Sequence, residues 1–137
     1  MVKLYADEEG HEAVRRHEVL VVSAIARVEV ASALWRKQRA GELAAEACAV
    51  LLRAFAADLA GSGGAAGTTL LEVAVSSRVL VDAARLTGSG RLRSYDAVQL
   101  ASARAARAAD PSVVTFACFD RRLGEAAAAE GFAALKR

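Results

Sequence analysis

The chain has 137 residues, 55% of them hydrophobic and 25% charged, which is the composition of one globular domain with a sizeable core. A net charge of +2 is too small to indicate nucleic-acid binding by itself. Charged residues interrupt every long apolar stretch, and acidic residues at 7–9 precede any apolar segment of a signal peptide. We therefore expect a cytoplasmic protein without membrane contact, in which Cys48 and Cys118 are reduced thiols of the core.

In chain order, the first half predicts one strand followed by a pair of long helices. An apolar piece at 1–5 and a short helix at 11–16 precede a strand at 19–22. Ser23 is a candidate N-cap for a helix at 24–39, which Gly41 closes, and a second helix at 42–60 completes a helical hairpin. Apolar residues lie on several sides of the first helix, so we expect it to be largely buried. A Gly-rich loop follows at 61–67.

The second half alternates strands with helices. A short strand at 68–73 leads to a helix that Ser76 or Ser77 could cap and that ends near Thr87. The next helix runs to about residue 109 and stops before Pro111. A buried strand at 113–118, a helix at about 122–130 with Gly131 as its C′ residue, and a short strand at 132–135 complete the chain. This alternation predicts a parallel α/β sandwich.

Three acidic residues stand close to predicted strand ends and helix starts. Asp120 directly follows the apolar strand, Asp96 lies at the start of an alanine-rich helix, and Glu29 lies inside a nearly all-apolar helix. In a parallel sheet such positions can meet at the edge where α/β proteins bind ligands. Because neighbouring carboxylates repel one another, a divalent cation with hard oxygen ligands is the usual partner of such a cluster.

Each acid also has a purely structural interpretation. Glu29 could pair with Arg27 or Arg36, because a buried carboxylate is costly when unpaired. Asp96 could be a favourable charge in the first turn of its helix, and Asp120 could be the N-cap of the helix that follows it. The placement of the three acids together, rather than any one of them, therefore points to a metal site.

The segments around these acids resemble the motifs of one protein family. Residues 22–34, which contain Glu29, match the second acidic motif of the PIN domain, and residues 92–103, which contain Asp96, are similar to its third. The fourth motif resembles Phe119-Asp120-Arg121-Arg122-Leu123 with the Ala pair at 126–127 and Glu-Gly at 130–131. The chain as a whole is similar to a VapC-type toxin ribonuclease, the PIN-domain toxin of a bacterial toxin–antitoxin pair.

The resemblance implies both a fold and a chemistry. The fold would be a single PIN-like domain over residues 1–137, a three-layer α/β/α sandwich with a central parallel sheet. The activity would be that of an endoribonuclease that hydrolyses RNA phosphodiester bonds with water activated by Mg²⁺ or Mn²⁺. Asp96 would be a direct metal ligand, with Glu29 and Asp120 as direct or water-bridged ligands. Arginines that flank two of the acids could hold the RNA backbone, or could be plain surface charges or partners of carboxylates: Arg91, Arg93, Arg121 and Arg122.

Relative to the family pattern, the chain departs in two places. The family's first motif, a strand that ends in an aspartate, would precede the segment at 2–5, so we expect an N-terminally truncated chain without that strand and its metal ligand. Cys118 stands where the family has Thr or Ser, and a thiol is a poor replacement for a hydroxyl that orients water. The alternative function is therefore a catalytically impaired remnant that acts only by binding an antitoxin or another partner.

Partners follow from the same resemblance. We expect an RNA substrate, a cognate small antitoxin and a homodimer, for which the helical hairpin at 24–60 is a candidate surface. His11 and His17 are expected at the protein surface. Trp35 and Tyr95 are expected to pack in the core or in an interface, because aromatic residues that stack on bases usually form exposed clusters.

Overall fold

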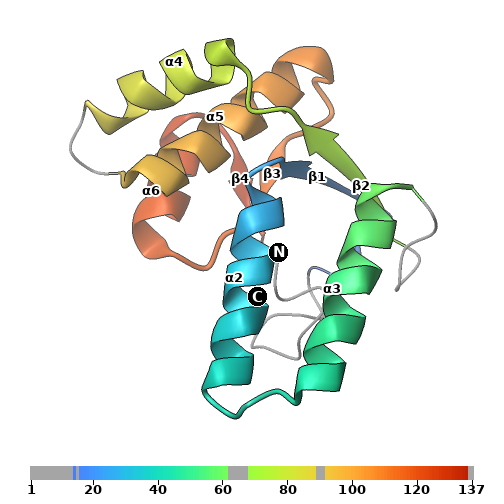
Figure 1. The fold of residues 1–137 in the computed structure, drawn as a ribbon. Helices are drawn as coiled ribbons and strands as arrows, with labels where there is room; N and C mark the ends of the chain where they lie inside the picture. Colours follow the sequence, from blue (N-terminus) through green and yellow to red (C-terminus); the bar gives the residue numbers. More distant parts are fainter. Residues whose placement is uncertain (1–13, 15, 62–67, 89–91, 136–137) are drawn as a thin grey trace. The chain divides into compact units, whose positions relative to one another are not determined.

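A computed structural model describes residues 14, 16–61, 68–88 and 92–135 of the chain (Figure 1). Several predicted features lie outside these residues: the apolar piece at 1–5, the acidic residues at 7–9, nearly all of the helix at 11–16 and most of the loop at 61–67. His11 and Arg91 also lie outside them. The described residues divide into two compact units. Unit 1 comprises the described residues up to Leu20 together with Ile25–Glu72, and unit 2 comprises Val21–Ala24 and the described residues from Val73 onward.

Two strands, β1 (Val19–Ser23) and β2 (Thr69–Val73), pair with each other and confirm the predicted strands at 19–22 and 68–73. At their beginnings the backbone N–H of Thr69 donates to the carbonyl of Glu18 over 2.7 Å. Just beyond the end of β1 the N–H of Ala24 donates to the carbonyl of Val73 over 2.9 Å. Because start pairs with start and end with end, the two strands run parallel.

The helices in the described part of unit 1 include α2 (Ala26–Arg39) and α3 (Ala45–Leu59), which contact each other as the predicted hairpin. Gly41 follows α2 with φ +74°, the left-handed conformation expected of a residue that closes a helix. The N-cap of α2 is Ile25 without a side-chain hydrogen bond, so the assignment of Ser23 as its cap is wrong. Ser23 instead ends β1, where its Oγ accepts a hydrogen bond from Ser102 Oγ over 2.8 Å.

The prediction that the first helix is largely buried is also wrong. Its buried residues are Ala26, Val30, Ala33 and Leu34, a spacing that forms one stripe along a helix. Val28 and Trp35, on another side of α2, are 59% and 44% exposed. Apolar composition was a poor guide here, because α2 shares only one face with its neighbours in the described part of unit 1.

Unit 2 contains α4 (Ser77–Thr87), α5 (Ser94–Ala109) and α6 (Arg121–Ala129), all close to their predicted positions. Ser76 caps α4, with its Oγ accepting a hydrogen bond from the N–H of Val79 over 3.4 Å. The helices α4 and α5 pack against each other, and small residues dominate the buried side of α5, which allows close approach. The buried residues of α5 are Ala97, Val98, Leu100, Ala101, Ser102 and Ala106.

The predicted buried strand at 113–118 is reduced to β3 (Thr115–Phe116), which pairs in parallel with β4 (Ala133–Ala134). Val114 is 52% exposed and Cys118 is half-buried, so neither the length nor the burial was predicted correctly. Within the described residues β3 has β4 as its only strand partner, which leaves much of the segment open. Gly131, with φ +82°, ends α6 as predicted.

The described residues form a mixed α/β fold with short parallel strands, as the alternation of elements predicted. The described strands make two sheets, β1–β2 and β3–β4. Tyr95, at 42% exposure, and Trp35 are surface residues, so neither lies in the core, and their predicted packing in an interface stays a prediction. In the described part of the chain, no helix has both the length and the apolar character needed to span a membrane. The extent of the predicted single domain, 1–137, stays a prediction.

Candidate functional site

Asp120 is the N-cap of α6, which confirms its structural interpretation. Its Oδ1 accepts a hydrogen bond from the N–H of Leu123 over 2.9 Å, and its negative charge lies at the end of the helix that favours anions. The residue is exposed. A carboxylate has about four acceptor positions on two oxygens, so this single hydrogen bond leaves most of its capacity available for a ligand.

Asp96 lies in the first turn of α5, as predicted, and is half-buried. The helix begins after Arg93, whose side chain makes no capping hydrogen bond. The neighbouring Ala97 and Leu100 are completely buried and anchor this end of α5 in the core of unit 2. Asp96 therefore sits on a fixed backbone with its side chain at the boundary between core and solvent.

Cys118 connects these two aspartates electrostatically. Its Sγ accepts a hydrogen bond from the N–H of Asp120 and donates one to the carbonyl of the same residue, both over 3.3 Å. Burial raises the pKa of the Cys118 thiol, the backbone hydrogen bond at Asp120 opposes this, and the negative charges of Asp120 and Asp96 raise the pKa further. Both carboxyl groups therefore act on a single thiol. Cys48 is fully buried, as expected of a core thiol, whereas Cys118 is only half-buried.

Glu29 belongs to α2 in unit 1, where it is half-buried between exposed Val28 and buried Val30. Arg27, one of its suggested partners, makes a two-pronged ion pair with Glu72 of β2, with Nε–Oε2 at 2.7 Å and Nη2–Oε1 at 3.3 Å. Across the described ranges, three or more His, Cys, Asp or Glu side chains do not gather in a group that could hold a metal ion. A joint metal site of Glu29 with Asp96 and Asp120 stays a prediction.

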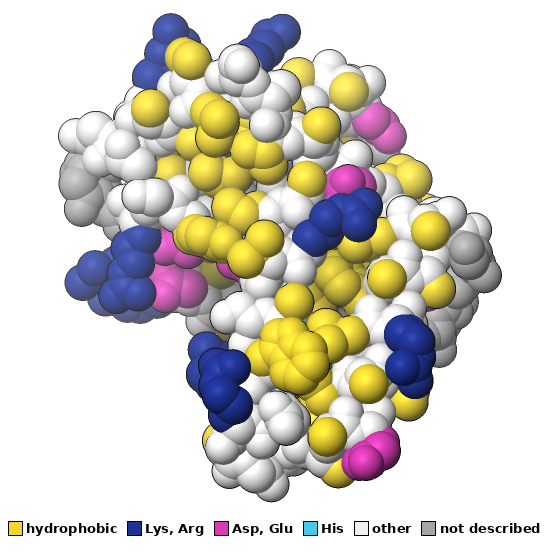
Figure 2. All heavy atoms as spheres, in the orientation of Figure 1, with side chains coloured by type: hydrophobic (Ala, Val, Ile, Leu, Met, Phe, Trp, Pro, Cys, Tyr) yellow, Lys and Arg dark blue, Asp and Glu magenta, His cyan; other side chains and the backbone are white. Residues whose placement is uncertain are grey.

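The arginines next to the acids lie at the protein surface. Arg93, Arg121 and Arg122 are all exposed. Arg121 pairs with Glu125 one turn along α6, with Nη1–Oε1 at 2.8 Å, which fits the interpretation of a carboxylate partner. On the face shown in Figure 2, Lys and Arg side chains occur in several separate groups.

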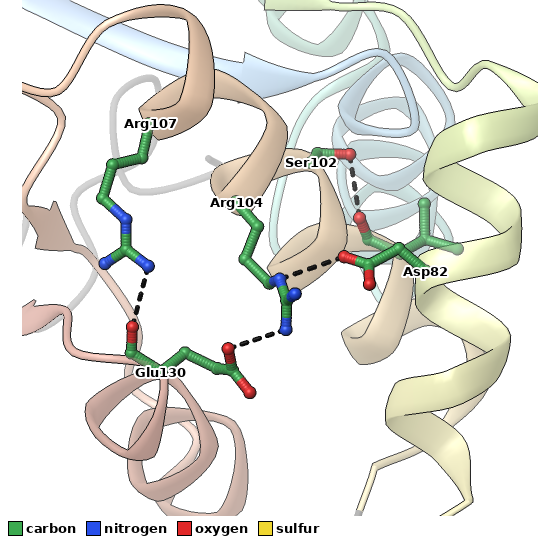
Figure 3. A network of polar contacts seen from close by, with 6 residues as sticks. Asp82, Ser102, Arg104, Arg107 and Glu130 are labelled. Atoms are coloured by element: carbon green, nitrogen blue, oxygen red, sulfur yellow. Dashed lines mark hydrogen bonds and ion pairs between the residues drawn. The ribbon is translucent and has the colours of Figure 1, made fainter.

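A network of charged residues at the far end of α6 was not predicted from the sequence (Figure 3). Arg104 of α5 makes ion pairs with Asp82 of α4 and with Glu130, and Arg107 donates a hydrogen bond to the Glu130 carbonyl. Arg107 also covers the ring of Phe132 at 4.0 Å from its centroid. The i,i+3 spacing of the two arginines indicates a common helix face, but nothing in the sequence identifies their partners.

The chain matches no model of a known protein family and no curated protein. Its functional assignment therefore depends on the side chains described above and on the motifs that contain them.

Proposed function

We propose that the protein is a metal-dependent endoribonuclease with a PIN-like α/β/α fold, and that it is the toxin of a toxin–antitoxin pair. The observation that supports this most is the position of Asp96 and Asp120 at the N-terminal ends of α5 and α6, together with Cys118, which is hydrogen-bonded to Asp120 and whose pKa both carboxylates raise. The two carboxylates belong to different helices, which are separated along the chain by residues 110–120. They coincide with the third and fourth acidic motifs of the resemblance.

The donor set fits a hard divalent cation. Asp96 and Asp120 offer carboxylate oxygens, the ligands that Mg²⁺ and Mn²⁺ prefer, and Mg²⁺ needs few protein ligands because it retains several waters. In the proposal Asp96 and Asp120 hold the ion, with Glu29 as a further ligand. A bound ion would supply an acidic water for attack on the phosphodiester and would neutralise developing negative charge.

The remaining side chains have supporting roles. The raised pKa of Cys118 keeps its thiol protonated at neutral pH, so that it adds no third negative charge beside Asp96 and Asp120. Arg93 and Arg122 are exposed beside these acids in the sequence, where their guanidinium groups are suited to bidentate contacts with RNA phosphates. The homodimer belongs to the proposal too, with Val28, Trp35 and Val50 as exposed apolar side chains on the hairpin α2–α3.

The test is cleavage of a total tRNA and mRNA mixture by the purified protein with Mg²⁺, Mn²⁺ or EDTA. We expect cleavage with either metal and none with EDTA. Asp96→Asn should lower the rate at least about 100-fold, because metal-based stabilisation of the transition state is worth several kcal/mol. Glu42→Gln is the matched control, since it neutralises an exposed carboxylate paired only loosely with Lys37 at 3.5 Å.

Two results would decide against this function. A folded protein that neither cleaves RNA nor gains thermal stability from Mn²⁺ would contradict metal-dependent catalysis. If that protein still bound a small partner tightly, the binding-only alternative would be favoured. Equal loss of activity in Asp96→Asn and Glu42→Gln would show that the effect of the first is not specific to the proposed site.

A further inference from the structure

Arg104 joins three helices of unit 2 through two ion pairs (Figure 3). From α5, its Nε lies 3.0 Å from Asp82 Oδ2 on α4, and its Nη1 lies 2.7 Å from Oε2 of Glu130, the C-cap residue of α6. The side chains of Asp82, Glu130 and Arg104 are 26%, 31% and 36% exposed, respectively. They are therefore less open to solvent than the Arg121–Glu125 pair, at 80% and 63%, and less weakened by screening.

A second attachment lies one helical turn further along α5. Arg107 Nη2 donates to the carbonyl oxygen of Glu130 over 2.8 Å, which satisfies a carbonyl at the helix end and places a cation there. The same guanidinium covers Phe132, which is 4% exposed and packs against Phe116 with a ring-centroid distance of 5.9 Å. The C-terminal end of α6 is thus attached to α5 by both charge and packing.

The position of the C-terminal end of α6 affects the position of its N-terminal end, where Asp120 lies. The helix α6 has nine residues, or about 14 Å at about 1.5 Å per residue, and Asp120 is its N-cap. A tilt of about 5° around the C-terminal end moves the N-cap by roughly 1 Å, a displacement that can cost an active site about 100-fold in rate. The buried residues of α6 are Leu123 and Ala127, one turn apart, so its apolar anchoring is narrow.

We propose that Arg104 and Glu130 are positioning residues that clamp the C-terminal end of α6 to α4 and α5, and thereby fix Asp120 relative to Asp96. The inference rests on the proposed ribonuclease function for the roles of the two aspartates. The clamp consists of the ion pairs of Arg104 with Asp82 and Glu130, and its existence does not depend on that function.

Cys118 provides a readout that needs no activity. Its thiol is hydrogen-bonded to Asp120 at the start of α6, whereas Cys48 is completely buried in unit 1. We expect Arg104→Met to raise the labelling rate of Cys118 by a thiol reagent about fivefold in metal-free buffer, through easier local opening of the α6 N-terminus. Cys48 should stay protected, which shows that unit 1 has not unfolded. Cys118→Ala identifies the labelled site.

A second variant separates a mechanical effect from an electrostatic one. Arg104→Met removes a positive charge and Glu130→Gln removes a negative one, so a purely electrostatic effect would change the labelling rate in opposite directions in the two variants. Loss of the clamp speeds labelling in both Arg104→Met and Glu130→Gln, and we expect at least about a twofold rise in the second, because Gln retains a weaker acceptor. Glu42→Gln, with the same charge change elsewhere, should leave the rate unaltered.

The catalytic readout is the separation of kcat from KM. Arg104→Met should lower kcat about 10- to 100-fold and change KM for RNA less than about twofold, because it displaces a catalytic group without touching the substrate. The double variant with Glu130→Gln should cost no more than Arg104→Met alone, as expected of two partners in one interaction.

Each outcome decides one of the two proposals. If the wild-type protein shows no metal-dependent cleavage, the proposed function fails and the labelling rates still test the clamp. An unchanged or slower Cys118 rate in folded Arg104→Met overturns the clamp, whatever the activity. If Arg104→Met and Glu130→Gln both expose Cys48 as well, the network supports the whole fold rather than the position of α6, and the clamp is again overturned.

Discussion

At the scale of single residues, Asp120 combines a structural task with a proposed catalytic one, and two substitutions separate them. Asp120→Asn keeps an oxygen that accepts from the N–H of Leu123, so the free energy of unfolding should change by less than about 0.5 kcal/mol while RNA cleavage is lost. Asp120→Ala removes the cap as well and should cost about 1 kcal/mol. Urea unfolding measures both variants, and equal stabilities would contradict the cap.

Cys118 predicts a pH dependence of stability. Burial is the main cause that raises its pKa above the ordinary value of 9.0. Below that value the thiol is protonated in both the folded and the unfolded chain, so it contributes no pH dependence. Above it the unfolded chain loses the proton first, and the free energy of unfolding should fall as the pH rises towards the pKa of the folded state.

The measurement for Cys118 is a comparison of urea midpoints at two pH values. The midpoint of the wild-type protein should fall more between about pH 7.5 and about pH 9.5 than that of Cys118→Ser, whose hydroxyl does not titrate in this range. Identical slopes for the two proteins would show that the thiol is not buried in solution as it is in the structure.

At the scale of elements, α2 is amphipathic although its sequence is apolar on several sides, and adjacent residues test this. Leu34 is completely buried, so Leu34→Ala should cost about 3 kcal/mol through lost burial and the cavity left behind. Trp35 is 44% exposed, so Trp35→Ala should cost less than about 1 kcal/mol despite the larger side chain removed. Thermal unfolding followed by circular dichroism compares them. The reverse order would mean that Trp35, not Leu34, faces the core.

At the scale of the whole molecule, the chain passes from unit 1 to unit 2 inside β1 and again inside β2. Unfolding one unit therefore frays strands that continue into the other, and we expect a single cooperative transition. Trp35 is the single tryptophan and reports on unit 1, while labelling of Cys118 reports on unit 2. The two probes should give the same urea midpoint. Separate midpoints would show that the units unfold independently.

The proposed toxin role predicts a small protein partner that offers an Arg or Lys to the acidic residues. Co-expression with the product of the adjacent small gene should yield a complex that co-purifies. Asp96→Asn and Asp120→Asn should weaken that complex about tenfold or more, because each leaves the partner's cation without its charged acceptor, whereas Glu42→Gln should not. Failure to co-purify, or equal affinity for all three variants, would count against this partner chemistry.

The sequence by itself determined the features that depend on near neighbours along the chain. These features involve atoms within a few residues of one another: the cap of α4, which the sequence placed at Ser76 or Ser77, the left-handed glycines 41 and 131, and the N-cap interpretation of Asp120. Local pattern was sufficient to name them as candidates. Most helices and strands were placed correctly for the same reason, and so was the α/β class, which follows from their alternation.

Only the tertiary structure decided which sides of these elements are buried and which distant residues meet. Burial depends on how many neighbours an element has, so apolar composition wrongly predicted a buried strand at 113–118 and an enclosed α2. Arg104 and Glu130 are 26 residues apart, and their pairing follows from the packing of α5 and α6 rather than from either segment. The common influence of Asp96 and Asp120 on Cys118 likewise requires the folded chain, because Coulomb interactions depend on distance in space and not along the sequence.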